Sequence, residues 1–286
     1  MLDLSIIIVT YNSRELLKKS LESIYKHISG ISFEVIVVDN ASTDNTVEMI
    51  KTCFPKVKLI TSDKNLGLFA GRNLAFKEAK GKYIINSAPD IILVENIKKM
   101  IDFMENNPEI GVMGPQLLNP DGTIQESGAR FMDLLDGIWN VLMLNAFGLN
   151  NPVRLRHHYY PWNRTTSKEV DVVSGSFYIF RRELLEKIGY CDENFFVYCD
   201  EEDWCKRVKK IGYKVIYLPE PKVIHYHGKG GTHALGRNKA DKIYFNDLLY
   251  YYKKYYGYFV YVVFKMILSI TLPLLFSFRK IKSWFK

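Results

Sequence analysis

Four consecutive carboxylates, residues 200–203, follow a run rich in aromatic residues, and this is the pattern in the chain best suited to chemistry. The aromatic side chains of Phe195, Phe196 and Tyr198 offer an apolar wall that would partly desolvate a neighbouring carboxylate. Desolvation raises the pKa of a carboxyl group toward neutrality, as a general base requires. The segment also fits an ordinary capped helix, with acids in its first turn, bases in its last turn and Gly212 just beyond. We therefore expect a helix starting at residue 200, with a candidate base at Asp200 or Glu201.

Such a helix needs a scaffold, and the first half of the chain alternates short apolar runs with helical patterns. We expect strands over residues 5–9, 34–38, 56–60 and 82–86, and helices over residues 13–27 (capped by Ser13), over residues 43–53 and after Leu68. This spacing is typical of βαβ units, which form a parallel sheet covered by helices on both faces. The predicted fold class is α/β.

Ligands of an open α/β sheet bind at the carboxyl ends of its strands, and polar residues follow the predicted strands there. They are Thr10, Tyr11, Asn12, Asp39, Asn65, Gly67, Arg72 and Asp90. Each is also a common cap or turn residue, so none of them alone indicates a site. Their convergence on one edge of the sheet makes that edge the candidate binding site.

The motifs at these positions resemble glycosyltransferase family 2, particularly its rhamnosyltransferase-like branch. They are V-T-Y-N, V-V-D-N-A-S-T-D, N-L-G-L-F-A-G-R-N, G-P-Q-L-L-N-P-D-G-T-I-Q-E-S-G and C-D-E-N-F-F-V-Y-C-D-E-E-D-W-C-K-R, within residues 3–240. The resemblance implies a GT-A type fold with a Rossmann-like, mostly parallel sheet. It also implies an inverting transfer of a sugar, L-rhamnose from dTDP-rhamnose, to a hydroxyl of a lipid-linked or polysaccharide precursor of the cell surface. The alternatives are a family 2 transferase that uses a UDP-sugar, and a non-catalytic sugar-nucleotide-binding or scaffold protein.

The resemblance also suggests roles for individual residues. Asp39 would hold the base of the nucleotide, Thr10 and Tyr11 would line the nucleoside, and Arg72 would approach the nucleotide. In the family the second acid of the pair is the catalytic base, which is Glu201 by position. Because the usual Glu-Asp order is exchanged here, Asp200 remains the alternative. Further candidates for contacts to the diphosphate or the acceptor are Asp203, Trp204, Lys229 and Arg237.

The metal motif is where the chain departs from the family pattern. Relatives carry Asp-x-Asp or Asn-Pro-Asp after the fourth strand, whereas here Ala88 replaces the first acidic position and Asp90 occupies the second. Mg²⁺ or Mn²⁺ would stabilise the departing diphosphate, with Asp90 and His225 as candidate ligands. His225 also fits a core histidine beside a glycine loop. A closed zinc site is not expected without a cysteine pair, and Asp121-Gly122 is expected to form a hairpin turn rather than a metal site.

The C-terminal region differs in composition from the rest of the chain. The net charge is +8, and residues 248–286 contain seven basic residues and no acid, so the near-neutral remainder argues against nucleic-acid binding. Residues 258–278 are long enough to cross a bilayer, but a weakly polar stripe recurs at Lys265, Ser269, Pro273 and Ser277. We expect a helix lying on an anionic membrane surface; a spanning helix and a contact in a homo-oligomer are the alternatives.

The expected organisation is a GT-A domain over residues 1–240, divided near residue 115 into nucleotide-binding and acceptor halves, with a helical tail over residues 241–286. The four cysteines form no CxxC pair and suggest free, mostly buried thiols in a reducing cytosol. These features predict an enzyme on the cytoplasmic side of the cell membrane.

Overall fold

The structure is a computed structural model that describes residues 2–144, 152–228 and 234–284. Within these ranges the main sheet has nine strands in the order β3-β2-β1-β4-β10-β6-β11-β5, with β8 paired to β11, and β7 and β9 form a separate pair. The strands are β1 (Leu4–Thr10), β2 (Phe33–Asp39), β3 (Lys58–Thr61), β4 (Tyr83–Ser87), β5 (Ile91–Leu93), β6 (Ile110–Leu118), β7 (Gly128–Ala129), β8 (Lys168–Glu169), β9 (Val172–Val173), β10 (Phe177–Arg181) and β11 (Lys214–His225).

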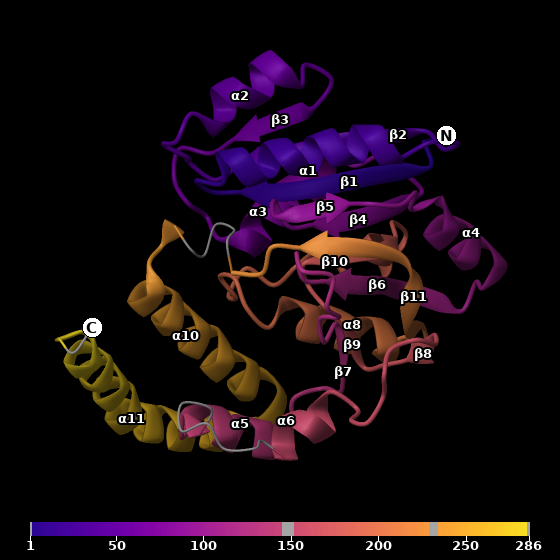
Figure 1. Cartoon of the computed structure of the whole chain (residues 1–286). Helices are drawn as coiled ribbons and strands as arrows, with labels where there is room; N and C mark the ends of the chain where they lie inside the picture. The colour runs from indigo at the N-terminus through magenta and orange to yellow at the C-terminus, as the bar shows by residue number, and fades with distance from the viewer. Residues whose placement is uncertain (1, 145–151, 229–233, 285–286) are drawn as a thin grey trace.

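Helices cover both faces of the main sheet (Figure 1). They are α1 (Arg14–His27), α2 (Thr46–Cys53), α3 (Leu68–Glu78), α4 (Lys98–Asn106), α5 (Leu134–Val141), α6 (Pro152–His157), α7 (Leu184–Ile188), α8 (Asp200–Lys210), α10 (Arg237–Tyr256) and α11 (Tyr258–Trp284). Alternate residues of β1 point to opposite sides: Ile6 and Ile8 pack with α1, α2 and α4, whereas Ile7 and Val9 pack with α3 and α8. Both faces of β1 are therefore buried, as its continuous apolar run predicted.

The sheet combines two parallel blocks. Strands β3, β2, β1 and β4 pair in parallel, as do β6 and β11, and antiparallel β10 lies between the two blocks. The predicted mostly parallel α/β fold is confirmed. The turn at Asp121-Gly122 is also confirmed, because Leu118 pairs with Ile124 in an antiparallel bridge and Gly122 has a φ of +84°.

Two expectations at helix starts were wrong. The Ser13 hydroxyl donates to the carbonyl of Tyr11 instead of capping α1. Helix α2 begins at Thr46 rather than residue 43, because Asn45 adopts a left-handed conformation with a φ of 61° and Asp44 accepts hydrogen bonds from Thr46. Local hydrogen bonds of this kind compete with helix formation.

Helices α10 and α11 form a hairpin beside α5 (Figure 1). In α10, Leu248, Tyr251 and Tyr252 are fully buried and belong to the same core cluster as α3 and α8. Helix α11 contributes Phe264 and Leu268 to that cluster. The C-terminal helices thus share a hydrophobic core with the sheet.

Candidate active site

The strand register brings the predicted binding residues to one edge of the sheet. Thr10 at the end of β1 pairs with Asp39 at the end of β2, and Ile8 pairs with Ser87 at the end of β4. On the other parallel block, antiparallel pairing of His225 with Ile91 places the end of β11 beside the segment that contains Asp90.

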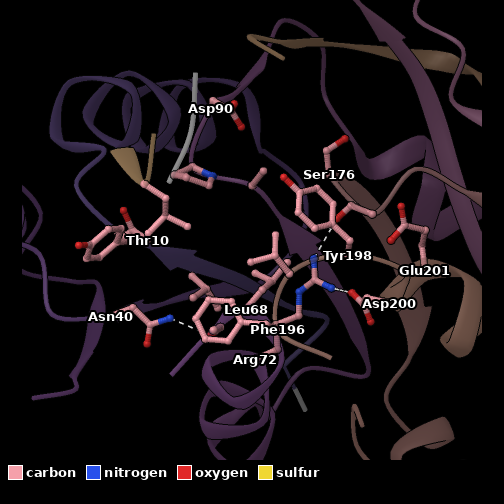
Figure 2. A pocket seen from close by; sticks show the side chains of 18 of the residues that line it. Thr10, Asn40, Leu68, Arg72, Asp90, Ser176, Phe196, Tyr198, Asp200 and Glu201 are labelled. Atoms are coloured by element: carbon pink, nitrogen blue, oxygen red, sulfur yellow. Dashed lines mark hydrogen bonds and ion pairs between the residues drawn. The ribbon is translucent and has the colours of Figure 1, made fainter. Parts of the chain in front are cut away.

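A pocket of about 410 Å³ opens at this edge (Figure 2). Its lining includes nine of the residues singled out from the sequence: Thr10, Tyr11, Asn65, Gly67, Arg72, Asp90, Asp200, Glu201 and His225. In Figure 2, Thr10 and Asp90 lie on one side of the pocket and Asp200 and Glu201 on the other. Strand ends and the first turn of α8 therefore face a common cavity.

Arg72 and Asp200 form a buried ion pair across this pocket, with each side chain only 4% exposed. The second guanidinium nitrogen of Arg72 donates to the Gly175 carbonyl at 2.9 Å. The guanidinium also lies 5.9 Å from the ring centres of Phe69 and Tyr178. Arg72 is thus held by contacts on several sides. The Asp200 carboxylate is paired with the positive charge of Arg72.

Glu201 has a different environment from Asp200. It is half-buried at the pocket wall, and a Cβ added at Gly175 would lie 3.0 Å from its Oε2, so the carboxylate rests against the Gly175 backbone. Burial raises the pKa of Glu201 despite opposing contributions from backbone amides and Arg72. The structure thus gives Glu201 the raised pKa expected of a base and gives Asp200 a bound cation.

Asp90 and His225 face one another at the other side of the pocket. His225 Nε2 lies 3.6 Å from Asp90 Oδ1. Burial, with His227 nearby, lowers the pKa of His225 to about 4, so its ring is neutral at pH 7. His225 Nδ1 lies 2.9 Å from Gln125 Oε1, while Gln125 Nε2 donates to the His225 carbonyl. This pairing places the proton on Nδ1 and turns the Nε2 lone pair toward the Asp90 carboxylate.

Several buried oxygens near the sheet edge lack hydrogen-bond partners within the described part of the chain, and two of them belong to residues singled out from the sequence. These two are Asp39 Oδ1 and Thr10 Oγ1. Asp39 Oδ2 accepts a hydrogen bond from the Ser42 amide at 2.9 Å, so one carboxylate oxygen is used structurally and the other is not. A buried oxygen without a partner is costly, and a ligand donor would relieve that cost.

Several sequence candidates lie away from the pocket. Asp203 binds Arg207, Lys254 and Tyr255, and Trp204 is fully buried against Phe180 and Phe76. Both residues are buried by these contacts and neither lines the pocket, so neither is in a position to contact a diphosphate or an acceptor there.

The remaining candidates have other placements. Asn12 Oδ1 accepts from the Thr43 backbone amide, and the Asn12 backbone amide donates to the Ser42 hydroxyl, so Asn12 links two loops and does not line the pocket. Arg237 is exposed at the start of α10, and Lys229 lies outside the described residues.

The structure also identifies pocket residues that the sequence analysis missed. Asn40 donates to the Gly67 carbonyl and leaves its own Oδ1 unpaired among the described residues. The segment from Ser174 to Ser176 forms part of the wall. Gln125, which orients His225, lies in the quoted G-T-I-Q-E-S-G motif, and only the chain fold could show that this motif meets the end of β11.

No group of three or more His, Cys, Asp or Glu side chains converges as a metal site within residues 2–144, 152–228 and 234–284. The pair formed by Asp90 and His225 nonetheless suits a divalent cation. A neutral imidazole lone pair and a carboxylate facing each other repel, and a cation bound between them would remove this repulsion.

The chain is similar in sequence to known glycosyltransferases. The family model described as "Glycosyl transferase family 2" matches residues 5–189, which is more than half of the chain. The chain is 26% identical over 252 residues to the N-acetylglucosaminyl-diphospho-decaprenol L-rhamnosyltransferase of Mycobacterium tuberculosis, covering 84% of this chain and 80% of that protein. It is 25% identical over 236 residues to the dTDP-rhamnosyl transferase RfbF of Shigella flexneri, covering 81% and 72%.

Among solved structures, the fold is similar to that of GalNAc-T7 with UDP, GalNAc and Mn²⁺. The TM-score is 0.59 at 18% identity, covering 85% of this chain and 47% of the other, so the chain spans about half of that structure. This likeness supports the GT-A fold. The family match over residues 5–189 shows that the chain belongs to glycosyl transferase family 2.

Proposed function

We propose that this glycosyltransferase moves L-rhamnose from dTDP-rhamnose to a hydroxyl of a lipid-linked or polysaccharide precursor, with inversion at the anomeric carbon and Glu201 as general base. The observation that carries the proposal is the half-buried Glu201 carboxylate at the pocket wall, whose pKa is raised by burial. Asp200 is the weaker candidate because its charge is bound to Arg72.

In this reaction the acceptor oxygen bonds to the anomeric carbon while the bond from that carbon to the diphosphate breaks. Glu201 takes the acceptor proton, and the nucleoside diphosphate leaves. Attack from the face opposite the leaving group inverts the anomeric configuration. The backbone of Gly175 would hold the Glu201 carboxylate in place, since no side chain stands between them.

The choice of donor is supported by the names of two relatives, which describe rhamnosyl transfer. The unpaired Asp39 Oδ1 suits the imide N–H that thymine and uracil share, so it supports a pyrimidine nucleotide without separating dTDP from UDP. Thr10 and Tyr11, at the end of β1, would line the nucleoside.

Asp90 and His225 would hold a divalent cation, Mg²⁺ or Mn²⁺. When bound, such a cation supplies positive charge to the departing diphosphate. Two protein ligands are too few to fill the coordination sphere of such a cation, so oxygens of the nucleotide diphosphate would be needed as further ligands. Gln125 would keep the Nε2 lone pair of His225 directed at the cation.

The proposed acceptor is attached to a lipid, and a membrane-facing surface is therefore expected. Residues Tyr258–Ser277 of α11 are apolar and long enough to cross a membrane by length and composition. Within the described part of α11, however, Phe264 and Leu268 are buried and the Thr271 hydroxyl donates to the Val141 carbonyl at 2.7 Å. These contacts hold the helix along α5, which favours attachment in the plane of the membrane over crossing it.

Both of these helices expose apolar side chains. Large hydrophobic side chains are exposed on both of them: Leu134, Leu135 and Ile138 on α5, and Tyr258, Phe259, Met266, Ile270 and Leu274 on α11. The predicted polar stripe runs along the same exposed side. Lys253 and Lys265 are exposed as well, whereas Lys254 is bound to Asp192 and Asp203. We propose that this surface docks on an anionic leaflet of the cytoplasmic membrane face.

Vesicle sedimentation across a salt series tests the docking. Ile270→Gln, which replaces a side chain that is 65% exposed, should weaken binding to anionic vesicles about tenfold, because burying an isoleucine contributes roughly 1.5–3 kcal/mol. Ile124→Gln, in the distant hairpin turn, is the matched control and should have no effect. Binding that is indifferent to salt, lipid charge and Ile270 would favour a spanning helix or an oligomer contact.

A panel of dTDP-sugars and UDP-sugars tests the reaction itself. We expect dTDP-rhamnose to raise the melting temperature most, because a ligand that binds only the folded state stabilises it. In the presence of Mn²⁺ and a diphosphate-lipid-linked N-acetylglucosamine, rhamnose transfer should follow, with the anomeric configuration inverted by NMR. If transfer occurs from a UDP-sugar and not from dTDP-rhamnose, the proposed donor is wrong. If the anomeric configuration is retained, the proposed inverting mechanism is wrong.

A further inference from the structure

Asp247 on α10 binds three successive backbone amides of the segment that precedes α8. Its Oδ1 accepts from the Phe196 amide at 2.9 Å, and its Oδ2 accepts from the amides of Val197 at 2.9 Å and Tyr198 at 2.8 Å. Asp247 is 3% exposed. Consecutive amides that converge on one anion hold a backbone segment in a single conformation, and each charged hydrogen bond is stronger than a neutral one.

The segment held by Asp247 belongs to the pocket wall. Phe196, Val197 and Tyr198 all line the pocket, and the chain continues through Cys199, with a left-handed φ of 66°, directly into Asp200 and Glu201. The conformation of this segment therefore sets where α8 begins and where the Glu201 carboxylate lies.

The opposite side of the segment rests on the start of α3. The Leu68 amide donates to the Phe196 carbonyl at 2.7 Å, and Figure 2 shows the two residues side by side. A Cβ added at Gly67 would lie 2.7 Å from that carbonyl, so the contact leaves no space for a side chain. The segment is fixed between the nucleotide-binding half and α10.

Neighbouring residues on α10 extend the contact along the same stretch of chain. Tyr244 packs on Tyr198 with ring centres 5.3 Å apart, and Tyr250 packs on Phe195 at 4.8 Å. Spacings of three residues place Tyr244, Asp247 and Tyr250 on one face of the helix. This face is turned toward the segment that leads to Glu201.

We propose that Asp247 is a positioning residue for catalysis: it fixes the backbone of residues 196–198 so that Glu201 meets the acceptor hydroxyl. The inference rests on the proposed role of Glu201. Asp247 itself touches neither donor nor acceptor, since it does not line the pocket. Asp247→Asn removes the charge and turns an NH₂ group toward an amide donor, so at least one of the three hydrogen bonds is lost.

Hydrogen exchange measured by mass spectrometry tests the positioning without relying on activity. In Asp247→Asn, amides 196–198 should exchange at least tenfold faster, because a hydrogen bond to a charged group contributes about 1.5–3 kcal/mol. Peptides from β1 and α3 should be unchanged. Asp241→Asn, the same substitution at the other carboxylate of α10, is the control and should exchange as wild type does at these amides. Unchanged exchange at residues 196–198 in Asp247→Asn would overturn the proposal.

The kinetic arm separates positioning from a general loss of structure. Asp247→Asn should lower kcat about 10- to 100-fold while the Kd for dTDP changes less than about threefold. If amides 196–198 exchange faster in Asp247→Asn but kcat stays at the wild-type value, Asp247 does not position Glu201 for catalysis. Asp247→Glu keeps the charge and moves the carboxylate by one methylene, so its exchange at residues 196–198 and its kcat should lie closer to wild type than those of Asp247→Asn. A kcat restored to wild type without slower exchange at residues 196–198 would overturn the proposal. If no sugar donor is used at all, the proposed function fails, but the exchange result still decides whether Asp247 holds the segment.

Discussion

The buried pair of Arg72 and Asp200 gives the sharpest prediction about stability. Replacing Asp200 by Asn leaves the Arg72 guanidinium without its carboxylate in a site where both side chains are 4% exposed. Breaking one partner of a buried ion pair typically destabilises a protein by about 3–5 kcal/mol, because the remaining charge stays desolvated. At about 2 °C per kcal/mol for a chain of this length, the melting temperature should fall by about 6–10 °C.

Urea unfolding followed by tryptophan fluorescence measures this effect, since Trp204 is fully buried beside the same core. The series contains Asp200→Asn, Arg72→Met and the double variant. The double variant should be less destabilised than the sum of the two single variants, with a coupling energy of about 2–3 kcal/mol. The exposed pair of Lys58 and Glu78 is the control, and Glu78→Gln should change stability by less than about 1 kcal/mol.

Two results would refute this reasoning. If Asp200→Asn unfolds within about 1 kcal/mol of wild type, the Arg72 charge does not depend on Asp200 in the folded protein. If the double variant equals the sum of the single variants, the two side chains do not interact energetically, whatever their positions.

Three further predictions concern the pocket and its surroundings. Asp39→Ala should weaken dTDP and UDP binding by about 1–3 kcal/mol in calorimetric titration, because a base donor loses its acceptor; unchanged affinity for both would remove Asp39 from the site. Mn²⁺ should bind weakly to the free protein and well with dTDP present, and His225→Ala should weaken the ternary binding in the same titration without unfolding the protein; full activity in excess chelator would exclude the metal role. Burial raises the pKa of Glu202 to about 8 from an ordinary value of 4.5, so its contribution to stability is fully present below pH 4.5 and is lost as the pH rises to about 8. Glu202→Gln should therefore stabilise the protein relative to wild type at pH 8, and do so much less at pH 5. The difference in free energy of unfolding between variant and wild type should grow by up to about 1.4 kcal/mol per pH unit. If chemical unfolding gives a difference that does not depend on pH, the raised pKa of Glu202 is contradicted.

The strands and helices of the first half were predictable because their patterns are local. The apolar run of β1 has the length of a strand buried on both faces, and the acids of α8 follow the helix dipole. The spacing of Trp204, Cys205 and Val208 is also a local signal, because it marks the apolar stripe of α8. Trp204 was nevertheless predicted as a contact to the diphosphate or the acceptor, whereas it lies in the core.

Other features depend on contacts between distant parts of the chain. No local pattern indicates that antiparallel β10 inserts between β4 and β6, or that Arg72 meets Asp200. The role of Asp247 could not be predicted from the sequence either. An acid within a tyrosine-rich helix is expected to be solvated, and only the fold shows that three backbone amides donate to it. The strand-end residues were predictable as a group, whereas their individual partners were not.

The role of Glu201 as general base is tested most directly by comparing the turnover of Glu201→Gln with that of Glu202→Gln. Both carboxylates lie in the first turn of α8, but Glu202 does not line the pocket and instead contacts the Met132 amide and the Tyr251 hydroxyl. We expect Glu201→Gln to lower kcat by about 10²- to 10⁴-fold with dTDP affinity retained, and Glu202→Gln to keep near-normal turnover. Near-normal turnover in Glu201→Gln, with Asp200→Asn folded and inactive, would contradict the assignment of Glu201 as the base.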